Sequence, residues 1–313
     1  MKGNICLSCC KTLTLEEYNS YHGLHKDCFC KVFHLSSWSD FENVVLKNQG
    51  SDSASLDKDN PQRYRNFTSS FFQGQFKKYT AELNGKEYIL KVQEKEAPEL
   101  PDNEYLCNQI ALNLGLNVPN FFLIDFYGVR TFIVENFMTT LSHPVSLNHI
   151  YHYLKEDSHY SCKELLEIIQ KETGDFHYQE SFVQMCLFDS LIGNHDRHGR
   201  NLGFLNFPKK TILAPIYDNP SFLGLQSGSI LQAQFNPKGK IRTEKTNEPG
   251  MIDYVVEFFD RGFESSVKEF FKKIKISKIQ NLMEESFCSV NMKKAFQRLF
   301  TQRYEELRNA LSH

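Results

Sequence analysis

The sequence predicts an α+β fold with a small, β-rich N-terminal lobe and a mainly helical C-terminal lobe. One observation is the dipeptide Asn84-Gly85 between two strand-like segments, because it suits a two-residue hairpin turn whose central positions need positive φ. The other is the run of amphipathic segments from about Asp253 to Leu311, in which apolar residues recur at helical spacing. Strands are therefore expected early in the chain and helices late.

Two strand pairs and several helices are predicted in order along the chain. The strand pairs lie at residues 76–83 with 86–92 and 121–126 with 130–137. A helix from Glu104 to Leu114, with Gly115 as its C-cap, separates the two pairs. Helices are also predicted at 161–173 and 179–192, and the second is apolar nearly all round, so we expect it to be buried.

The composition is that of a folded globular protein. Of the 313 residues, 41% are hydrophobic and 24% are charged, with 10 Pro and 16 Gly, which excludes collagen-like and wholly disordered chains. The 36 basic and 38 acidic residues give a net charge of −2, so no overall positive field draws the chain onto nucleic acid or anionic lipid. We therefore expect neither direct nucleic-acid binding nor membrane association.

The sequence also predicts a cytoplasmic protein. No stretch reaches the roughly eighteen apolar residues of a membrane span, and the opening MKGNICLSCCKTL lacks the apolar run of a secretory signal. Delivery to another cell by a route without a cleaved signal stays open. Nine cysteines in such a compartment, five of them within the first 30 residues, favour metal binding or free thiols over disulfides.

Local composition divides the chain into four regions. Residues 1–35 are rich in Cys and His, residues 36–66 form a linker that is strongly polar from 47 onward, residues 67–137 form the N-terminal lobe and residues 138–313 form the C-terminal lobe. Two lobes of this kind leave a cleft between them, which is where ligands tend to bind.

The loop after the apolar helix carries the residues best suited to phosphoryl transfer. Asp196 and Asn201 have the D-x-x-x-x-N spacing of a kinase catalytic loop, and Asp218 ends the strand pair that follows. Phosphoryl transfer needs a carboxylate beside the attacking hydroxyl, oxygen ligands for Mg²⁺ and a cation on the phosphates. Lys91 on a hairpin strand and Glu104 on the next helix suit the cation and its partner. Each residue alone would be an ordinary surface residue in most proteins, but their joint order favours a kinase.

Three segments resemble the motifs of the HipA-like kinase family: DNEYLCNQIALNLGLNVP at 102–119, GNHDRHGRN at 193–201 and LAPIYD at 213–218. The resemblance covers about residues 65–305 and is greatest to the short HipT-type members. It implies a two-lobed fold like that of protein kinases and ATP-dependent phosphorylation of serine or threonine. Known members are toxins that phosphorylate aminoacyl-tRNA synthetases and are held by an antitoxin, so a toxin-antitoxin role with such partners is implied as well.

By position, the resemblance implies a role for each of the candidate residues. Asp196 corresponds to the catalytic base, Asn201 and Asp218 to the magnesium ligands, and Lys91 to the phosphate contact with Glu104 as its partner. ATP and Mg²⁺ are the implied cofactors. Ordinary protein kinases have Phe-Gly after the metal-binding Asp, whereas this chain has Asn-Pro, so an activation switch of their kind is not expected.

Two further segments are implied to contact ATP. The segment from Glu135 to Phe137 resembles the hinge that contacts adenine through main-chain groups. The phosphate loop corresponds to SSFFQGQFKKY at 69–79, where Ser70 and Gly74 are candidate contacts. Ser69 and Ser70 are also candidates for autophosphorylation.

The Cys/His-rich opening offers two pairs of metal ligands. Cys6 and Cys9 are followed, fifteen residues later, by His25 and Cys28, and two such pairs can close a tetrahedral zinc site. Cys10, His22 or Cys30 could substitute for one of them, or the cysteines could simply pack beside Tyr21, Phe29 and Phe33. A zinc ion in this segment would be structural, because the segment lies far in sequence from the catalytic loop.

Two other functions stay open beside a protein kinase. A lipid or small-molecule kinase is one, although Lys268, Lys272, Lys273 and Lys275 form only a modest basic cluster of the sort that a membrane-facing helix carries. A nucleotide-binding pseudokinase that acts by docking is the other, because Phe72 stands where short HipT-type members have a second Ser of the phosphate loop.

Overall fold

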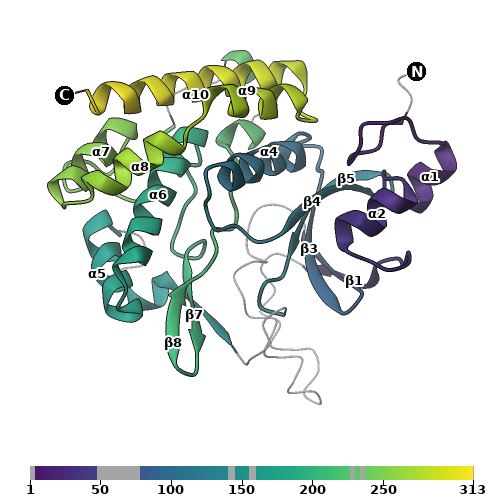
Figure 1. Ribbon diagram of the computed structural model, residues 1–313, viewed down its shortest axis with the longest axis horizontal. Helices are drawn as coiled ribbons and strands as arrows, with labels where there is room; N and C mark the ends of the chain where they lie inside the picture. Colours follow the sequence, from purple (N-terminus) through teal and green to yellow (C-terminus); the bar gives the residue numbers. More distant parts are fainter. Residues whose placement is uncertain are drawn as a thin grey trace. The chain divides into compact units, whose positions relative to one another are not determined.

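The computed structural model describes residues 4–47, 78–139, 145–154, 160–225, 230–232 and 237–312 (Figure 1). These residues belong to two compact units. Unit 1 comprises Met1–Tyr105 and Asn120–Thr140, and unit 2 comprises Leu106–Pro119 and Leu141–His313. Strands dominate unit 1 and helices dominate unit 2, so the predicted α+β class is confirmed. The four-region division remains a prediction.

Unit 1 is built on a five-stranded antiparallel sheet in the order β1-β2-β3-β5-β4. The strands are β1 (Glu42–Lys47), β2 (Lys78–Leu83), β3 (Lys86–Val92), β4 (Phe121–Phe126) and β5 (Val129–Glu135). Asn84 and Gly85 join β2 to β3 with φ of 51° and 74°, which is the two-residue turn that the sequence predicts.

The two faces of this sheet carry different chemistry. Lys91 pairs in register with Phe132, whereas Tyr88, three residues earlier, pairs with Glu135, so Lys91 and Tyr88 lie on opposite faces. The Tyr88 face is covered by α2 (Lys26–Phe33), which Figure 1 draws in purple together with α1 (Leu15–Ser20). The Phe33 ring lies 5.7 Å from that of Tyr88. The face that carries Lys91 lies opposite to α2.

Strand β1 lies within residues 36–66, where the sequence analysis placed a linker. Phe41 is buried against the rings of Phe33 and Tyr88, and this contact brings the following residues alongside β2. As an edge strand, β1 leaves Val44 and Val45 exposed, so its sequence lacks the apolar alternation of a half-buried strand. Residues 48–66 lie outside the described residues.

Helix α4 (Leu100–Asn113) begins in unit 1, ends in unit 2, and starts four residues earlier than predicted. Pro101 fits the first turn of a helix, where its missing N–H has no partner to lose. Gly115 has a φ of 72°, and the Leu116 N–H donates to the Ala111 carbonyl at 3.0 Å, so Gly115 ends the helix as predicted.

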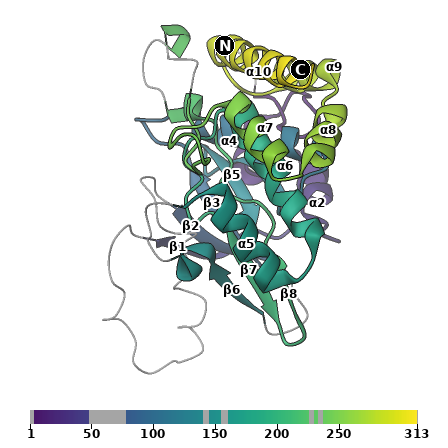
Figure 2. The ribbon, with the colours of Figure 1, turned by 90° about the vertical axis from the view of Figure 1, so that its left-hand side faces the viewer.

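Unit 2 is organised around α6 (Phe176–Ile192), which is buried without interruption from Phe182 onward, as the sequence predicts. Figure 2 shows it among α5 (Cys162–Thr173), α7 (Met251–Asp260) and α8 (Glu264–Lys273), all of which it contacts. The helices α9 (Ile276–Glu285) and α10 (Val290–Ala310) complete the helical region, and α10 also contacts α6. Short 3-10 helices occur at Ile150–Tyr153, Phe222–Leu225 and Ile230–Gln232.

A small sheet supports the loop that follows α6. It contains β6 (Ser146–His149), β7 (Gly203–Phe207) and β8 (Lys210–Leu213) in antiparallel order, and β7 and β8 form the predicted hairpin. The loop of residues 193–202, called the catalytic loop below, therefore runs between a buried helix and a paired strand. Within the described parts of the chain, no helix is both long and apolar enough to cross a membrane.

Candidate active site and metal centre

In unit 1, Lys91 and Glu104 form the ion pair that their positions predict. Lys91 Nζ lies 2.5 Å from Glu104 Oε1 and 5.8 Å from the centre of the Phe132 ring. Glu104 is 2% exposed, and a carboxylate buried to this degree is costly without a cation beside it. The pair therefore holds the Lys91 ammonium on the face of the sheet opposite to α2.

The candidate hinge follows β5 and is held by side chains of unit 1. The Glu135 carboxylate accepts hydrogen bonds from Lys86 Nζ and Asn120 Nδ2, each at 3.2 Å. Its side chain lies on the Tyr88 face, opposite to Lys91, and its main-chain N–H donates to the Asn120 carbonyl at 2.8 Å. Asn136, before Phe137, donates its main-chain N–H to the Glu87 carbonyl at 2.8 Å.

The candidate residues of the phosphate loop are not part of the described structure. Ser69, Ser70, Phe72 and Gly74 all lie outside the described residues, and their contacts with ATP remain predictions.

In unit 2, the catalytic loop is organised by Arg197, which is only 2% exposed. Its guanidinium donates to both carboxylate oxygens of Asp189, each at 2.8 Å, and to Asn219 Oδ1 at 2.6 Å. It also donates to the main-chain carbonyls of Tyr217 at 2.6 Å and Asn201 at 3.3 Å. Burial alone would lower the pKa of Arg197, but the charges of Asp189 and Asp218 outweigh burial and raise it. Arg197 thus joins α6, the catalytic loop and the segment around Asp218.

Asp196, next to Arg197, faces the solvent. Its side chain is 63% exposed, and His198 Nε2 lies 4.0 Å from its carboxylate. The main chain of Asp196 is held from both sides: its N–H donates to Asn194 Oδ1 at 3.0 Å, and its carbonyl accepts from Asn201 Nδ2 at 3.2 Å. The loop therefore presents an accessible carboxylate from a fixed backbone.

Asn194 connects Asp196 to Asp218. Its amide nitrogen donates to Asp189 Oδ1 at 3.1 Å and lies 3.5 Å from the Asp218 carbonyl oxygen, while its Oδ1 accepts from Asp196. Asp218 has a φ of 60°, a left-handed conformation that Asp tolerates better than most residues. Because Asn201 bonds Asp196 through its amide nitrogen, its Oδ1 is the atom it can offer a cation. Carboxylate and amide oxygens from Asp218 and Asn201 are of the type that Mg²⁺ prefers, so unit 2 has donors that fit the ion.

Asn219 and two tyrosines complete the support of the loop. Asn219 is fully buried and donates to Asn108 Oδ1 at 3.0 Å. The Tyr160 hydroxyl donates to the Arg197 carbonyl at 2.8 Å, and the Tyr217 hydroxyl donates to the Arg200 carbonyl at 2.9 Å. The residue that replaces Phe of the usual kinase motif is therefore part of a buried polar network.

Arg197, Asn194 and Asn219 were not assigned individual roles from the sequence. The signal that could have found Arg197 is Asp189, an acidic residue in a helix that is otherwise apolar nearly all round. A buried carboxylate requires a cation or several donors, and Arg197 lies eight residues further along the chain. Asn194 and Asn219 have no such signal, because their partners come together only in the folded structure.

In unit 1, Cys6, Cys9, His25 and Cys28 form a compact group, called the Cys/His cluster below. Their ligand atoms all lie within 4.8 Å of one another. Burial, and then the neighbouring thiols of Cys9 and Cys6, raises the pKa of the Cys28 thiol to about 12. The cluster has the geometry that a metal site needs.

The alternative ligands considered from the sequence are not part of the Cys/His cluster. His22 Nε2 lies 2.7 Å from Asp40 Oδ1, and the His22 ring stacks on Phe126 at 5.3 Å. Cys10 and Cys30 also lie outside the group of converging ligand atoms. The structure thus selects one ligand set from those that the sequence left open.

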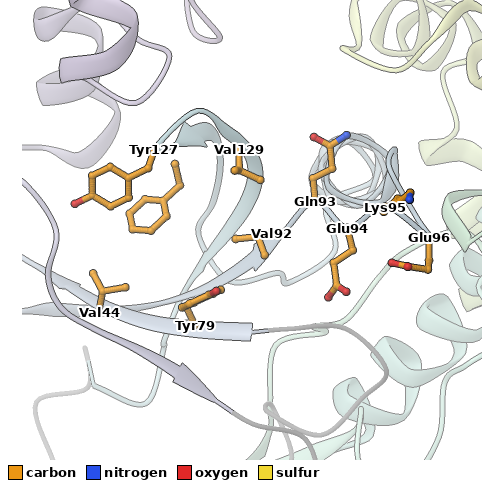
Figure 3. A pocket seen from close by; sticks show the side chains of 10 residues that line it. Val44, Tyr79, Val92, Gln93, Glu94, Lys95, Glu96, Tyr127 and Val129 are labelled. Carbon is orange, nitrogen blue, oxygen red and sulfur yellow. The ribbon is translucent and has the colours of Figure 1, made fainter.

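Unit 1 also contains a pocket of about 600 Å³, shown in Figure 3. Tyr79 and Val92 line it from the strands, together with residues 93–96 and the β4–β5 turn. In register, Tyr79 and Val92 lie on the Tyr88 face of the sheet, opposite to Lys91. Among the described residues that line this pocket there is no predicted active-site residue.

Comparisons with known proteins show the family of this chain and its fold. Residues 70–249 match the family model of the HipA-like C-terminal domain. A Haemophilus influenzae protein that is provisionally named a kinase is 28% identical over 151 residues, which cover 42% of this chain and 44% of that protein. The aligned part thus spans less than half the length of this curated relative.

Two solved structures show a similar fold. The Helicobacter pylori proinflammatory kinase CtkA has a TM-score of 0.64 and 19% identity, over 75% of this chain and 93% of that one. HipA from Shewanella oneidensis MR-1, in a toxin-antitoxin complex with HipB and operator DNA, has a TM-score of 0.55 and 16% identity, over 74% of this chain and 62% of that one. Because the family model matches more than half of its residues, the chain belongs to the HipA-like C-terminal domain family.

Proposed function

We propose that this protein is an ATP-dependent kinase that phosphorylates serine or threonine on a protein substrate. The observation that carries the proposal is the exposed carboxylate of Asp196 on a loop that buried Arg197 fixes from beneath. A surface loop without a task rarely has a buried, fully engaged guanidinium beneath it, whereas a catalytic base must be both accessible and rigidly placed.

In the proposed reaction, Asp196 orients the substrate hydroxyl and accepts its proton. The hydroxyl oxygen attacks the γ-phosphorus of ATP, the bond between that phosphorus and the β–γ bridging oxygen breaks, and ADP leaves. Lys91, held by Glu104, stabilises negative charge on the phosphates. Asn201 and Asp218 would hold Mg²⁺, which neutralises charge on the phosphate oxygens when bound.

The remaining nucleotide contacts follow from the family resemblance. We propose that the main chain from Glu135 to Phe137 contacts adenine and that Ser70 and Gly74 belong to the phosphate loop. Support for the hinge comes from the Glu135 carboxylate, which Lys86 and Asn120 hold on the Tyr88 face, away from Lys91.

The proposed biological setting is the bacterial cytoplasm and a toxin-antitoxin system. The support is the fold shared with the Shewanella oneidensis HipA, which is found with HipB and its operator DNA. An aminoacyl-tRNA synthetase is the proposed class of substrate, and an antitoxin protein is the proposed partner, both by analogy with the family.

The test compares phosphate transfer from γ-labelled ATP by the wild type and by Asp196→Asn. The reaction contains Mg²⁺, and a bacterial extract supplies the protein substrates. We expect Asp196→Asn to lose roughly 10²–10⁴-fold in transfer rate while it still binds ATP. The control is Asp260→Asn, which removes an equally exposed carboxylate on α7 and should retain wild-type transfer.

Each outcome of this test has a meaning. Equal transfer by the wild type and Asp196→Asn would refute the assignment of the base. Tight ATP binding without transfer to any protein would favour the docking pseudokinase, and label recovered only in lipid or small molecules would favour the other kinase class.

A further inference from the structure

The Cys/His cluster combines two short structures that each supply two ligands. Cys6 and Cys9 belong to a tight turn in which the Cys10 N–H donates to the Cys6 carbonyl at 2.9 Å and Cys10 has a φ of 59°. His25 is the N-cap of α2, and Cys28 lies in the first turn of the same helix. A rigid turn and a helix start thus face each other across the cluster.

The two distances from His25 to the thiols of Cys9 and Cys28 are close to the edges of a metal tetrahedron. With a Zn–S bond of about 2.3 Å and a Zn–N bond of about 2.05 Å, neighbouring ligand atoms lie roughly 3.6–3.8 Å apart. His25 Nδ1 lies 3.4 Å from Cys9 Sγ and 3.9 Å from Cys28 Sγ. Side chains that merely fill a core would have no reason to direct three sulfur atoms and one ring nitrogen at a common centre.

The second nitrogen of His25 supports this arrangement. His25 Nε2 lies 3.2 Å from the Thr12 carbonyl oxygen, which can only accept a hydrogen bond. Nε2 therefore carries the proton, and the lone pair of Nδ1 is directed into the cluster. Metal-ligating histidines are commonly oriented by a carbonyl in this way.

We propose that the Cys/His cluster binds a single Zn²⁺ ion and that this ion links the Cys6–Cys9 turn to the start of α2, so that the N-terminal segment, residues 4–41, keeps the fold that packs against the sheet of unit 1. Three thiolates and one imidazole in a tetrahedral set suit zinc, whereas Mg²⁺ and Ca²⁺ prefer oxygen ligands. With four protein ligands the site is closed, so the ion has a structural role.

The N-terminal segment needs a stabilising cross-link of this kind. Its helices have only 6 and 8 residues, too short to be stable in isolation. All nine cysteines of the chain are free thiols, so no disulfide replaces the metal. The segment nevertheless covers one face of the sheet, where the Phe33 ring lies 4.7 Å from that of Phe122 and 5.7 Å from that of Tyr88. Zinc would thus stabilise the layer that lies behind the strand carrying Lys91.

The first experiment measures zinc bound to the purified full-length protein by elemental analysis. We expect about one zinc ion per chain in the wild type and near-complete loss in Cys9→Ser and Cys28→Ser. Cys10→Ser and Cys30→Ser are the matched controls, because each removes a nearby thiol outside the cluster, and both should retain the zinc. A wild type without zinc, or controls that lose as much zinc as Cys9→Ser, would overturn the proposal.

A second measurement separates metal binding from failure to fold. The wild type, stripped with a chelator and loaded with Co²⁺, should show the ligand-field absorption of tetrahedral Co²⁺ together with thiolate charge-transfer bands. Octahedral Co²⁺ absorption without those bands would contradict the ligand set.

The structural role is tested by thermal unfolding. A chelator should lower the midpoint of the wild type and leave that of Cys9→Ser unchanged, because the variant has no zinc to lose. An unchanged midpoint for the wild type after zinc removal would refute the role of the ion in the fold. None of these measurements involves phosphate transfer. The zinc proposal can therefore be refuted while the kinase proposal stands, and the kinase proposal can be refuted while the zinc proposal stands.

Discussion

Units 1 and 2 each contain a cation paired with a buried carboxylate, and the two pairs differ in what else the cation holds. Arg197 binds Asp189 through two parallel hydrogen bonds and also holds Asn219 and two main-chain carbonyls. Lys91 pairs with Glu104 from a strand, and its side chain remains 12% exposed. Arg197 therefore holds the parts of the catalytic loop together, whereas Lys91 keeps part of its side chain exposed, where it can meet a ligand.

The largest expected effect comes from Arg197→Leu. It would leave Asp189 buried and without its cation, so we expect a loss of about 3–5 kcal/mol in the free energy of unfolding. Arg200→Leu is the matched control, because Arg200 lies in the same loop with an exposed side chain, and its loss should stay within about 0.5 kcal/mol. Denaturant unfolding measures both variants. Equal losses would show that the guanidinium of Arg197 does not support the loop.

The second effect concerns Lys91→Met. Glu104 would lose its cation while buried, so we expect a loss of about 2 kcal/mol in stability together with the loss of measurable ATP binding. Lys86→Met is the control on the same strand: Lys86 also pairs with a buried carboxylate, but it is 41% exposed, so the loss should be under about 1 kcal/mol. Denaturant unfolding compares the two variants, and ATP titration by calorimetry is made on Lys91→Met. Wild-type ATP binding by Lys91→Met would refute the role of Lys91.

The sequence could predict those contacts whose residues lie close together in the chain, and it could not predict most of those that join distant residues. The Lys91–Glu104 pair follows from one strand and the next helix, and the Asn84-Gly85 turn is fully local, so both were predictable. The contacts of Arg197 join residues up to 22 positions apart around a buried site, and only the isolated Asp189 in an apolar helix hinted at them. Strand β1 was missed because its pairing depends on Phe41, whose partners lie far along the chain.

The third and smallest effect concerns the helix ends next to these elements. Gly193 ends α6 with a φ of 70°, and Gly174 ends α5 with a φ of 69°, so alanine is strained equally at both positions. An added Cβ at Gly193 would lie 2.8 Å from Leu299 Cδ2, whereas at Gly174 it would meet open space. We expect Gly193→Ala to cost about 1 kcal/mol more than Gly174→Ala in denaturant unfolding. Equal losses in the free energy of unfolding would show that the residues around Gly193 can shift to make room for the added Cβ.

The central claim is that Asp196 makes this chain a kinase for protein hydroxyl groups. The most direct measurement is quantitative phosphoproteomics of bacteria that express the wild type or Asp196→Asn at matched levels. The account predicts phosphoserine or phosphothreonine sites that are present with the wild type and absent with the variant. The same set of phosphosites in both cultures would contradict it.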